Sequence, residues 1–132
     1  RYPQLTRPGH VGIGGSSYGA VSALHIALRR PGTFDRLLLE SPSLFIGARR
    51  LLDDARDAPR LPSRIHLAIG TAESRDPAES ARVLDDALDL GRILRAKGLG
   101  SRRLQLHVEQ GARHHERFWA GRLPGALRFL FG

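Results

Sequence analysis

A serine stands at the centre of a G-x-S-x-G sequence, Gly15-Ser16-Ser17-Tyr18-Gly19, between a short apolar run and a helical pattern. A strand that breaks into such a turn and then into a helix is the layout of a nucleophile elbow, which lifts the serine hydroxyl clear of a sheet. We expect the glycines on either side of Ser17 to remove Cβ atoms that would clash where strand and helix approach. An ordinary helix N-cap is the alternative role for Ser17. The backbone N–H of Tyr18, at the start of the helix, would be one donor to an oxyanion.

Acidic and histidine side chains follow further along the chain, in the order that such a serine needs. Glu73 and Asp76 are the candidate acids, and His114 and His115 are the candidate bases. A serine hydroxyl becomes an effective nucleophile when a histidine takes its proton, and a carboxylate holds the imidazole ring and stabilises its protonated form. The order serine, acid, histidine is the one expected for a triad built on alternating strands and helices.

The elements that must position these side chains alternate between strands and helices. Short apolar runs and period-two patterns predict the strands, and helical periodicity, clearest over residues 77–97, predicts the helices. Such alternation favours an α/β fold with a mainly parallel sheet and helices on both faces, in which functional groups gather at the carboxyl ends of the strands. Strands are expected over residues 10–13, 36–40, 64–69 and 103–109, the last nearer a sheet edge, and helices over 18–30, part of 46–57, 77–97 and 116–131, the last interrupted near Pro124.

Composition narrows the classes of function. The 132 residues carry a formal charge of +8, but Lys97 is the only lysine and the arginines are scattered. This scattering disfavours a nucleic-acid interface. The surplus of positive charge could still attract anionic substrates. No segment has the length or apolar character of a signal peptide or membrane span. Without cysteine there is no thiolate metal site, and no set of His, Asp and Glu has metal-ligand spacing, so no metal is expected. We expect the remaining histidines to be structural: His10, His25, His66 and His107.

Nearly the whole chain resembles the carboxyl-terminal half of alpha/beta-hydrolases of the putative esterase group, related to enterochelin esterases and esterase D. The family's closing signature, His-Asn-Glu-x-x-Trp, is matched by His114-His115-Glu116-x-x-Trp119, which makes His114 the counterpart of the catalytic histidine. Ala20 replaces a second glycine of the family's elbow. The resemblance rests on Gly15-Ser16-Ser17-Tyr18-Gly19, Glu40-Ser41-Pro42-Ser43, Ile69-Gly70-Thr71-Ala72-Glu73, His114–Trp119 and Arg122-Leu123-Pro124.

The resemblance implies a serine hydrolase that cleaves small-molecule carboxylic esters through an acyl-enzyme, without metal or organic cofactor. Ser17 would be the nucleophile, His114 the base and Glu73 the acid, while Glu116 and Trp119 would support the histidine loop by hydrogen bonding and packing. Siderophore esters, thioesters and aryl esters remain open as substrates. An acyltransferase of the same fold and a non-catalytic remnant or basic binding domain are the alternatives.

The resemblance also implies that residues 1–132 are the carboxyl-terminal part of a single alpha/beta-hydrolase domain, because full members are about twice as long. The chain starts at Arg1 and contains no methionine. We therefore expect a truncated form with a partial fold, lacking the amino-terminal strands and the second oxyanion donor, and with little activity alone. A cytoplasmic location without nucleic-acid or membrane partners is expected, and the oligomeric state stays open.

Overall fold

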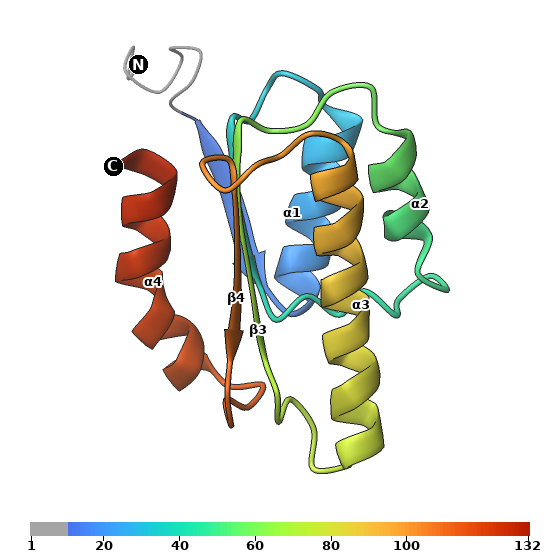
Figure 1. The fold of residues 1–132 in the computed structure, drawn as a ribbon, viewed down its shortest axis with the longest axis vertical. Helices are drawn as coiled ribbons and strands as arrows, with labels where there is room; N and C mark the ends of the chain where they lie inside the picture. Colours follow the sequence, from blue (N-terminus) through green and yellow to red (C-terminus); the bar gives the residue numbers. More distant parts are fainter. Residues whose placement is uncertain (1–10) are drawn as a thin grey trace.

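The computed structural model describes residues 11–132, and its centre is a sheet of four parallel strands. The strands lie in the order β1 (Gly12–Ser16), β2 (Arg36–Glu40), β3 (Arg64–Gly70) and β4 (Leu104–Glu109). Helices α1 (Tyr18–Arg29), α2 (Arg50–Asp57) and α3 (Pro77–Ala96) cover one face, and α4 (Glu116–Phe131) covers the other (Figure 1). The expected α/β fold, with helices on both faces of a parallel sheet and β4 at an edge, is confirmed.

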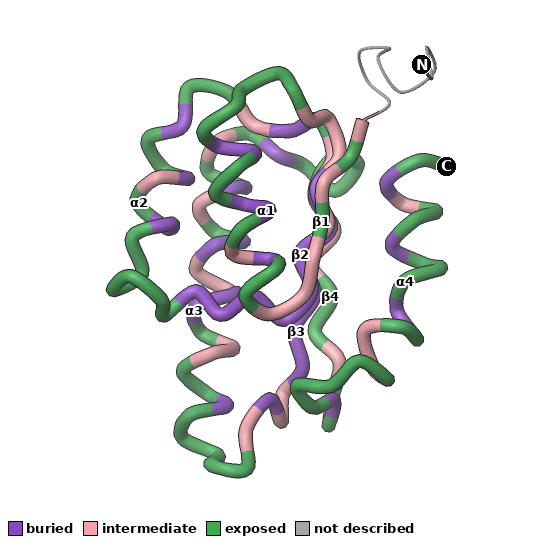
Figure 2. Tube along the Cα trace, turned by 180° about the vertical axis from the view of Figure 1, so that it is seen from behind, coloured by how far each residue is buried: buried purple, intermediate pink, exposed green. Residues whose placement is uncertain are grey.

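The two faces of the sheet differ in character because successive side chains of a strand point to opposite sides. Leu37 and Leu39 of β2 and Leu67 of β3 are fully buried in the apolar core formed with α1, α2 and α3. Their neighbours in sequence point toward α4, where the Arg36 and Arg64 guanidinium groups donate to carbonyl groups near the end of that helix. Figure 2 shows the buried positions concentrated on the inner strands and on the helix faces that cover them. The face beneath α4 is therefore the more polar of the two faces of the sheet.

Strand β1 lies further along the chain than residues 10–13, where the apolar pattern placed it. It runs over Gly12–Ser16 and pairs with the whole of β2, and His10 lies outside the described residues. The predicted strand ended at residue 13, before Gly14 and Gly15. In the structure both glycines pair with β2, and this pairing leaves no room for a side chain at Gly14, because a Cβ there would lie 2.6 Å from the Cβ of Leu38.

Helix α4 continues through Pro124, so the predicted interruption is wrong. Proline inside a helix removes one backbone hydrogen bond and crowds the preceding turn. The helix is held across that position because Arg122, Ala126 and Leu130 on its inner side are buried against the sheet. Tertiary contacts thus outweigh the local preference of one exposed proline.

Helices α1 and α3 end within one residue of their predicted limits, and α2 occupies the last eight residues of the ambiguous stretch 46–57. Asp76 is the N-cap of α3, and its side chain accepts a hydrogen bond from the N–H of Ala78. Between residues 11 and 132, no helix is both long and apolar enough to span a membrane.

Candidate active site

Ser17 occupies a sharp turn between the last residue of β1 and the first of α1. Its backbone has φ 56° and ψ −121°, and its N–H donates to the carbonyl oxygen of Glu40 at 2.9 Å. A positive φ is uncommon outside glycine and indicates a conformation that the surroundings impose. The side chain makes no capping hydrogen bond to α1. The structure therefore has the geometry of an elbow at Ser17 and not that of an ordinary N-cap.

The two glycines of the elbow have different surroundings. A Cβ on Gly15 would lie 2.5 Å from the carbonyl carbon of Gly19 and 2.6 Å from its oxygen, so the strand could not approach the helix with a larger residue there. A Cβ on Gly19 would meet no atom of the described residues within 4 Å. The expected clash is thus found at Gly15 only, and Gly19 is the backbone against which Gly15 packs.

The side chains of Ser17, His114 and Glu73 form a continuous hydrogen-bonded line. Nε2 of His114 lies 2.8 Å from Oγ of Ser17, and Nδ1 lies 2.7 Å from Oε2 of Glu73. These three residues follow β1, β4 and β3, whose carboxyl ends meet at one edge of the parallel sheet. The exposed fraction is 32% for the His114 side chain and 2% for Glu73. The imidazole thus connects a solvent-accessible hydroxyl to a buried carboxylate.

The neighbouring candidates have other contacts. Asp76, the alternative acid, caps α3 and is exposed. His115, the alternative base, caps α4, because its Nδ1 accepts a hydrogen bond from the N–H of Arg117 at 3.1 Å. Of the two acids and two histidines considered, the structure brings Glu73 and His114 to Ser17.

Glu73 is held in place by three hydrogen bonds. Its Oε1 accepts from the N–H of Gly70 at 2.7 Å and from the hydroxyl of Ser41 at 2.8 Å, while Oε2 faces His114. A Cβ on Gly70 would lie 2.1 Å from the carbonyl oxygen of Ala112 and 2.9 Å from Oε1 of Glu73. Only glycine fits where the loops after β3 and β4 approach so closely. The glycine that ends a predicted strand was the available sequence signal for this position.

The residues named as supports lie near the histidine in different ways. Trp119 packs edge-on against the ring of His114, with centroids 5.1 Å apart, and its Nε1–H donates to Ser41 Oγ at 3.0 Å. Glu116 is exposed, and its carboxylate lies 3.7 Å from Nδ1 of His115. Tyr18 is the first residue of α1, where backbone N–H groups have no acceptor within the helix.

A buried ion cluster lies beneath the site, on the α4 side of the sheet. The guanidinium group of Arg122 contacts Oε2 of Glu40 through Nε and Nη2, both at 2.8 Å, and Oε2 of Glu109 through Nη1 at 2.7 Å. Glu40 Oε1 and His66 Nε2 are 3.5 Å apart, and neither has a hydrogen-bond partner among the described residues. His66 also bonds Gln105 through Nδ1. Sequence reasoning gave Glu40 and Arg122 no role, because nothing local indicates that they meet.

A hollow of about 310 Å³ opens beside Ser17. Phe45 and Val83 give it an apolar wall, and Ser43 and His114 lie along it. The hydroxyl of Ser43 is 3.4 Å from that of Ser17. The hollow can therefore hold a small group attached to a carbonyl carbon that Ser17 reaches.

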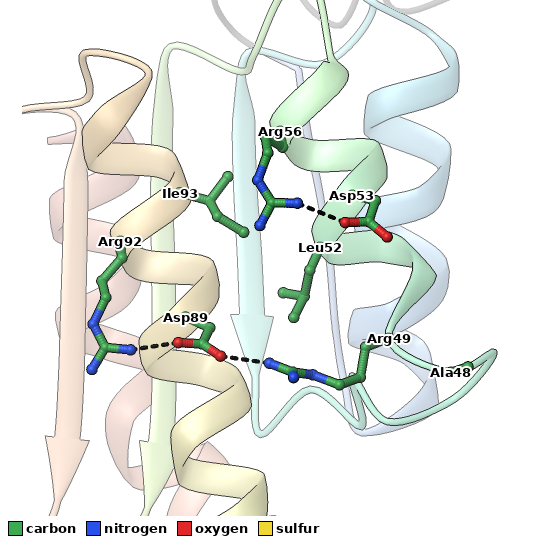
Figure 3. A pocket seen from close by; sticks show the side chains of 8 residues that line it. All are labelled: Ala48, Arg49, Leu52, Asp53, Arg56, Asp89, Arg92 and Ile93. Atoms are coloured by element: carbon green, nitrogen blue, oxygen red, sulfur yellow. Dashed lines mark hydrogen bonds and ion pairs between the residues drawn. The ribbon is translucent and has the colours of Figure 1, made fainter.

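A second hollow, of about 490 Å³, lies between α2 and α3 and does not include the site residues. Figure 3 shows its charged side chains engaged with one another: Asp89 contacts both Arg49 and Arg92, and Asp53 contacts Arg56. These charges are therefore already paired, and the contact between Arg49, at the start of α2, and Asp89 links α2 to α3.

Asp86 extends this link toward the core. Its carboxylate lies 2.8 Å from Nε of Arg49, and only 12% of its side chain is exposed. Burial raises the pKa of Asp86 above its ordinary value of 3.8; Arg49 opposes the shift, and the neighbouring carboxylates of Asp89 and Asp85 add to it.

Comparison with known proteins gives a family and a fold. The model of the family described as putative esterase matches residues 2–130. The chain is 25% identical to the uncharacterized protein YbbA of Bacillus subtilis in an alignment of 128 residues that covers 92% of this chain and 49% of YbbA. It therefore spans about half the length of this curated relative.

Solved structures with a similar fold include the enterobactin esterase FES from Shigella flexneri, with a TM-score of 0.76, 23% identity, and coverage of 95% of this chain and 31% of that one. The siderophore hydrolase EstB from Aspergillus nidulans gives a TM-score of 0.65 at 20% identity, covering 89% and 48%. The BES protein from Bacillus cereus gives 0.68 at 20%, covering 93% and 46%. At these identities the likeness concerns the fold.

Proposed function

The chain belongs to the putative esterase family, and from that premise we propose that it hydrolyses small-molecule carboxylic esters through an acyl-enzyme on Ser17. The observation that carries the proposal is the line from Ser17 Oγ through the His114 ring to Glu73, with both contacts within 2.8 Å. This arrangement of a hydroxyl, an imidazole and a buried carboxylate is recognised by its geometry on many folds. Relatives are longer than this chain, so the proposal concerns the chemistry of the site and not a particular relative's substrate.

Acylation begins when Ser17 Oγ attacks the carbonyl carbon of the ester and Nε2 of His114 takes the hydroxyl proton. Glu73 accepts the Nδ1 proton in its hydrogen bond, keeps the ring in the reactive tautomer and stabilises the imidazolium. The negative charge that develops on the carbonyl oxygen is stabilised by the N–H of Tyr18, at the positive end of α1. The tetrahedral intermediate then expels the alcohol, which receives the proton from His114.

Deacylation repeats the sequence with water in place of Ser17. His114 takes a proton from the water as it attacks the acyl carbon, and Ser17 leaves and recovers that proton. The hollow beside Ser17, with Phe45 and Val83 on its wall, is of a size for a short acyl or alcohol group. Small esters such as p-nitrophenyl acetate and butyrate are therefore suitable test substrates.

The proposal is tested with a fluorophosphonate probe, which forms a covalent bond with activated serines, and with release of p-nitrophenol. We expect the wild type to be labelled at Ser17 and the Ser17→Ala variant to be neither labelled nor active. Ser16→Ala is the matched control, because it removes the adjacent hydroxyl and leaves the hydrogen-bonded line intact. Equal labelling of wild type and Ser17→Ala, or no labelling of a folded wild type, would contradict the proposal.

A further inference from the structure

Ser41 is an unusual residue for the end of a strand. It follows β2 directly, is 0% exposed, and has φ 44°, in the left-handed region that disfavours a side chain. Its N–H donates to the carbonyl oxygen of Ala68 at 2.8 Å, which ties the turn to β3. A strained backbone conformation at a buried residue indicates that the surrounding structure imposes that conformation. Because a buried hydroxyl needs hydrogen-bond partners, the contacts of the Ser41 hydroxyl show what the residue does.

The contacts of Ser41 Oγ determine where its single proton points. The indole Nε1–H of Trp119 donates to Oγ at 3.0 Å, and Nη2 of Arg122 lies 3.5 Å away. Indole and guanidinium groups are donors only, so neither can accept the hydroxyl proton. The remaining neighbour is Oε1 of Glu73, at 2.8 Å. The Ser41 proton is therefore directed at the carboxylate.

This donation selects the way in which Glu73 faces the rest of the site. Oε1 is occupied by Ser41 and by the N–H of Gly70, which leaves Oε2 for Nδ1 of His114. The donors behind Ser41 are themselves fixed: Trp119 packs on the His114 ring, and Arg122 is held by Glu40 and Glu109. The orientation of the carboxylate is thus determined from the α4 side of the sheet.

We propose that Ser41 is a positioning residue for the reaction, whose hydroxyl, oriented by Trp119 and Arg122, fixes the Glu73 carboxylate so that Oε2 faces His114. The inference rests on the proposed function for its kinetic consequence. Ser41 does not touch the substrate or the reacting atoms; it acts through Glu73. Without its hydroxyl, Glu73 retains only the Gly70 contact on Oε1 and rotates more freely, so the His114 ring spends less time in the reactive orientation.

The test uses two substitutions that both remove the hydroxyl but differ in backbone strain. Ser41→Ala keeps the Cβ that serine already has at φ 44°, whereas Ser41→Gly relieves that strain, so an effect shared by both variants is due to the missing hydroxyl. We expect both to lower kcat for p-nitrophenyl butyrate by about 10- to 100-fold while KM stays within about twofold, because binding groups are untouched. Ser80→Ala is the matched control: it removes another buried hydroxyl, which among residues 11–132 bonds Ser74 and no other residue, and should keep kcat within about twofold.

A second measurement does not depend on turnover. In the NMR spectrum, the Nδ1 proton in the hydrogen bond between His114 and Glu73 gives a low-field resonance. We expect this resonance in the wild type and in Ser80→Ala. In both Ser41 variants we expect it to be shifted or broadened. Unchanged kcat and an unchanged resonance in a folded Ser41→Gly protein would overturn the inference while leaving the proposed function intact. An inactive, unlabelled wild type would overturn the proposed function, and the resonance would then still decide whether Ser41 positions Glu73.

Discussion

Replacing Arg122 with methionine should be among the most damaging single changes to stability in this protein. Among residues 11–132, the guanidinium group is the cation in contact with Oε2 of the Glu40 carboxylate, and the His66 ring lies 3.5 Å from its other oxygen. Methionine preserves the apolar length of the side chain and removes the charge. The Glu40 side chain, 4% exposed, is then left as a buried anion without its main partner.

The expected magnitude follows from the burial of the two acids. Removing one partner of a buried ion pair costs about 3–5 kcal/mol, because the remaining charge stays desolvated. Glu109 adds little to this cost, since 35% of its side chain is exposed and water can replace the lost contact. With total stabilities of about 5–15 kcal/mol for single domains, the change would lower Tm by about 10–20 °C.

The assay is urea unfolding at pH 7, followed by circular dichroism and by the fluorescence of Trp119, the only tryptophan. Coincident transitions would support two-state analysis, and an unchanged m value would assign the effect to the folded state. The double variant Arg122→Met with Glu40→Gln is the matched comparison. Because glutamine removes the unpaired buried charge, we expect it to recover about 1–2 kcal/mol relative to Arg122→Met alone. An unfolding free energy for Arg122→Met within about 1 kcal/mol of the wild type, or a double variant less stable than the single one, would refute this account of the cluster.

Three further predictions concern other parts of the fold. Gly15→Ala should lower the free energy of unfolding by about 1–3 kcal/mol and abolish probe labelling of Ser17, because its Cβ would meet backbone 2.5 Å away. Gly19→Ala should fold normally, because a Cβ at Gly19 meets open space. Thermal melts of the two variants check this, and equal Tm values would contradict it. Asp86 has a raised pKa in the folded state, so folding favours its protonated form. The stability of the wild type relative to Asp86→Asn should therefore be greatest at low pH and fall as the pH rises above about 3.8. Urea titrations from pH 3 upward measure this difference, and a constant difference would disprove the prediction. Pro124→Ala should raise the unfolding free energy by about 1–3 kcal/mol by restoring a backbone hydrogen bond within α4, and a lower Tm would show that proline is required there.

Local patterns in the sequence determined most of the elements. Strand β2 was predicted with its observed bounds, and α3 was predicted to within one residue, because apolar runs and helical periodicity depend on short-range spacing. Two local rules failed, at the glycines of β1 and at Pro124. In both places contacts with distant residues, the pairing with β2 in one case and packing on the sheet beneath α4 in the other, outweigh the propensity of the residue itself.

The residue types and their order were enough to name Ser17, Glu73 and His114, since each follows a strand whose carboxyl end lies at the same edge of a parallel sheet. Only the tertiary structure separated Glu73 from Asp76 and His114 from His115. It places His114 within hydrogen-bonding distance of both Ser17 and Glu73. Asp76 and His115 instead cap helices. It also brought Arg122 to Glu40 and Ser41, which lie more than 80 residues earlier in the chain. The strength of a hydrogen bond or an ion pair depends on the distance between the groups and on their burial in the folded molecule. Because the spacing of residues along the sequence specifies neither that distance nor that burial, short-range patterns cannot predict such contacts.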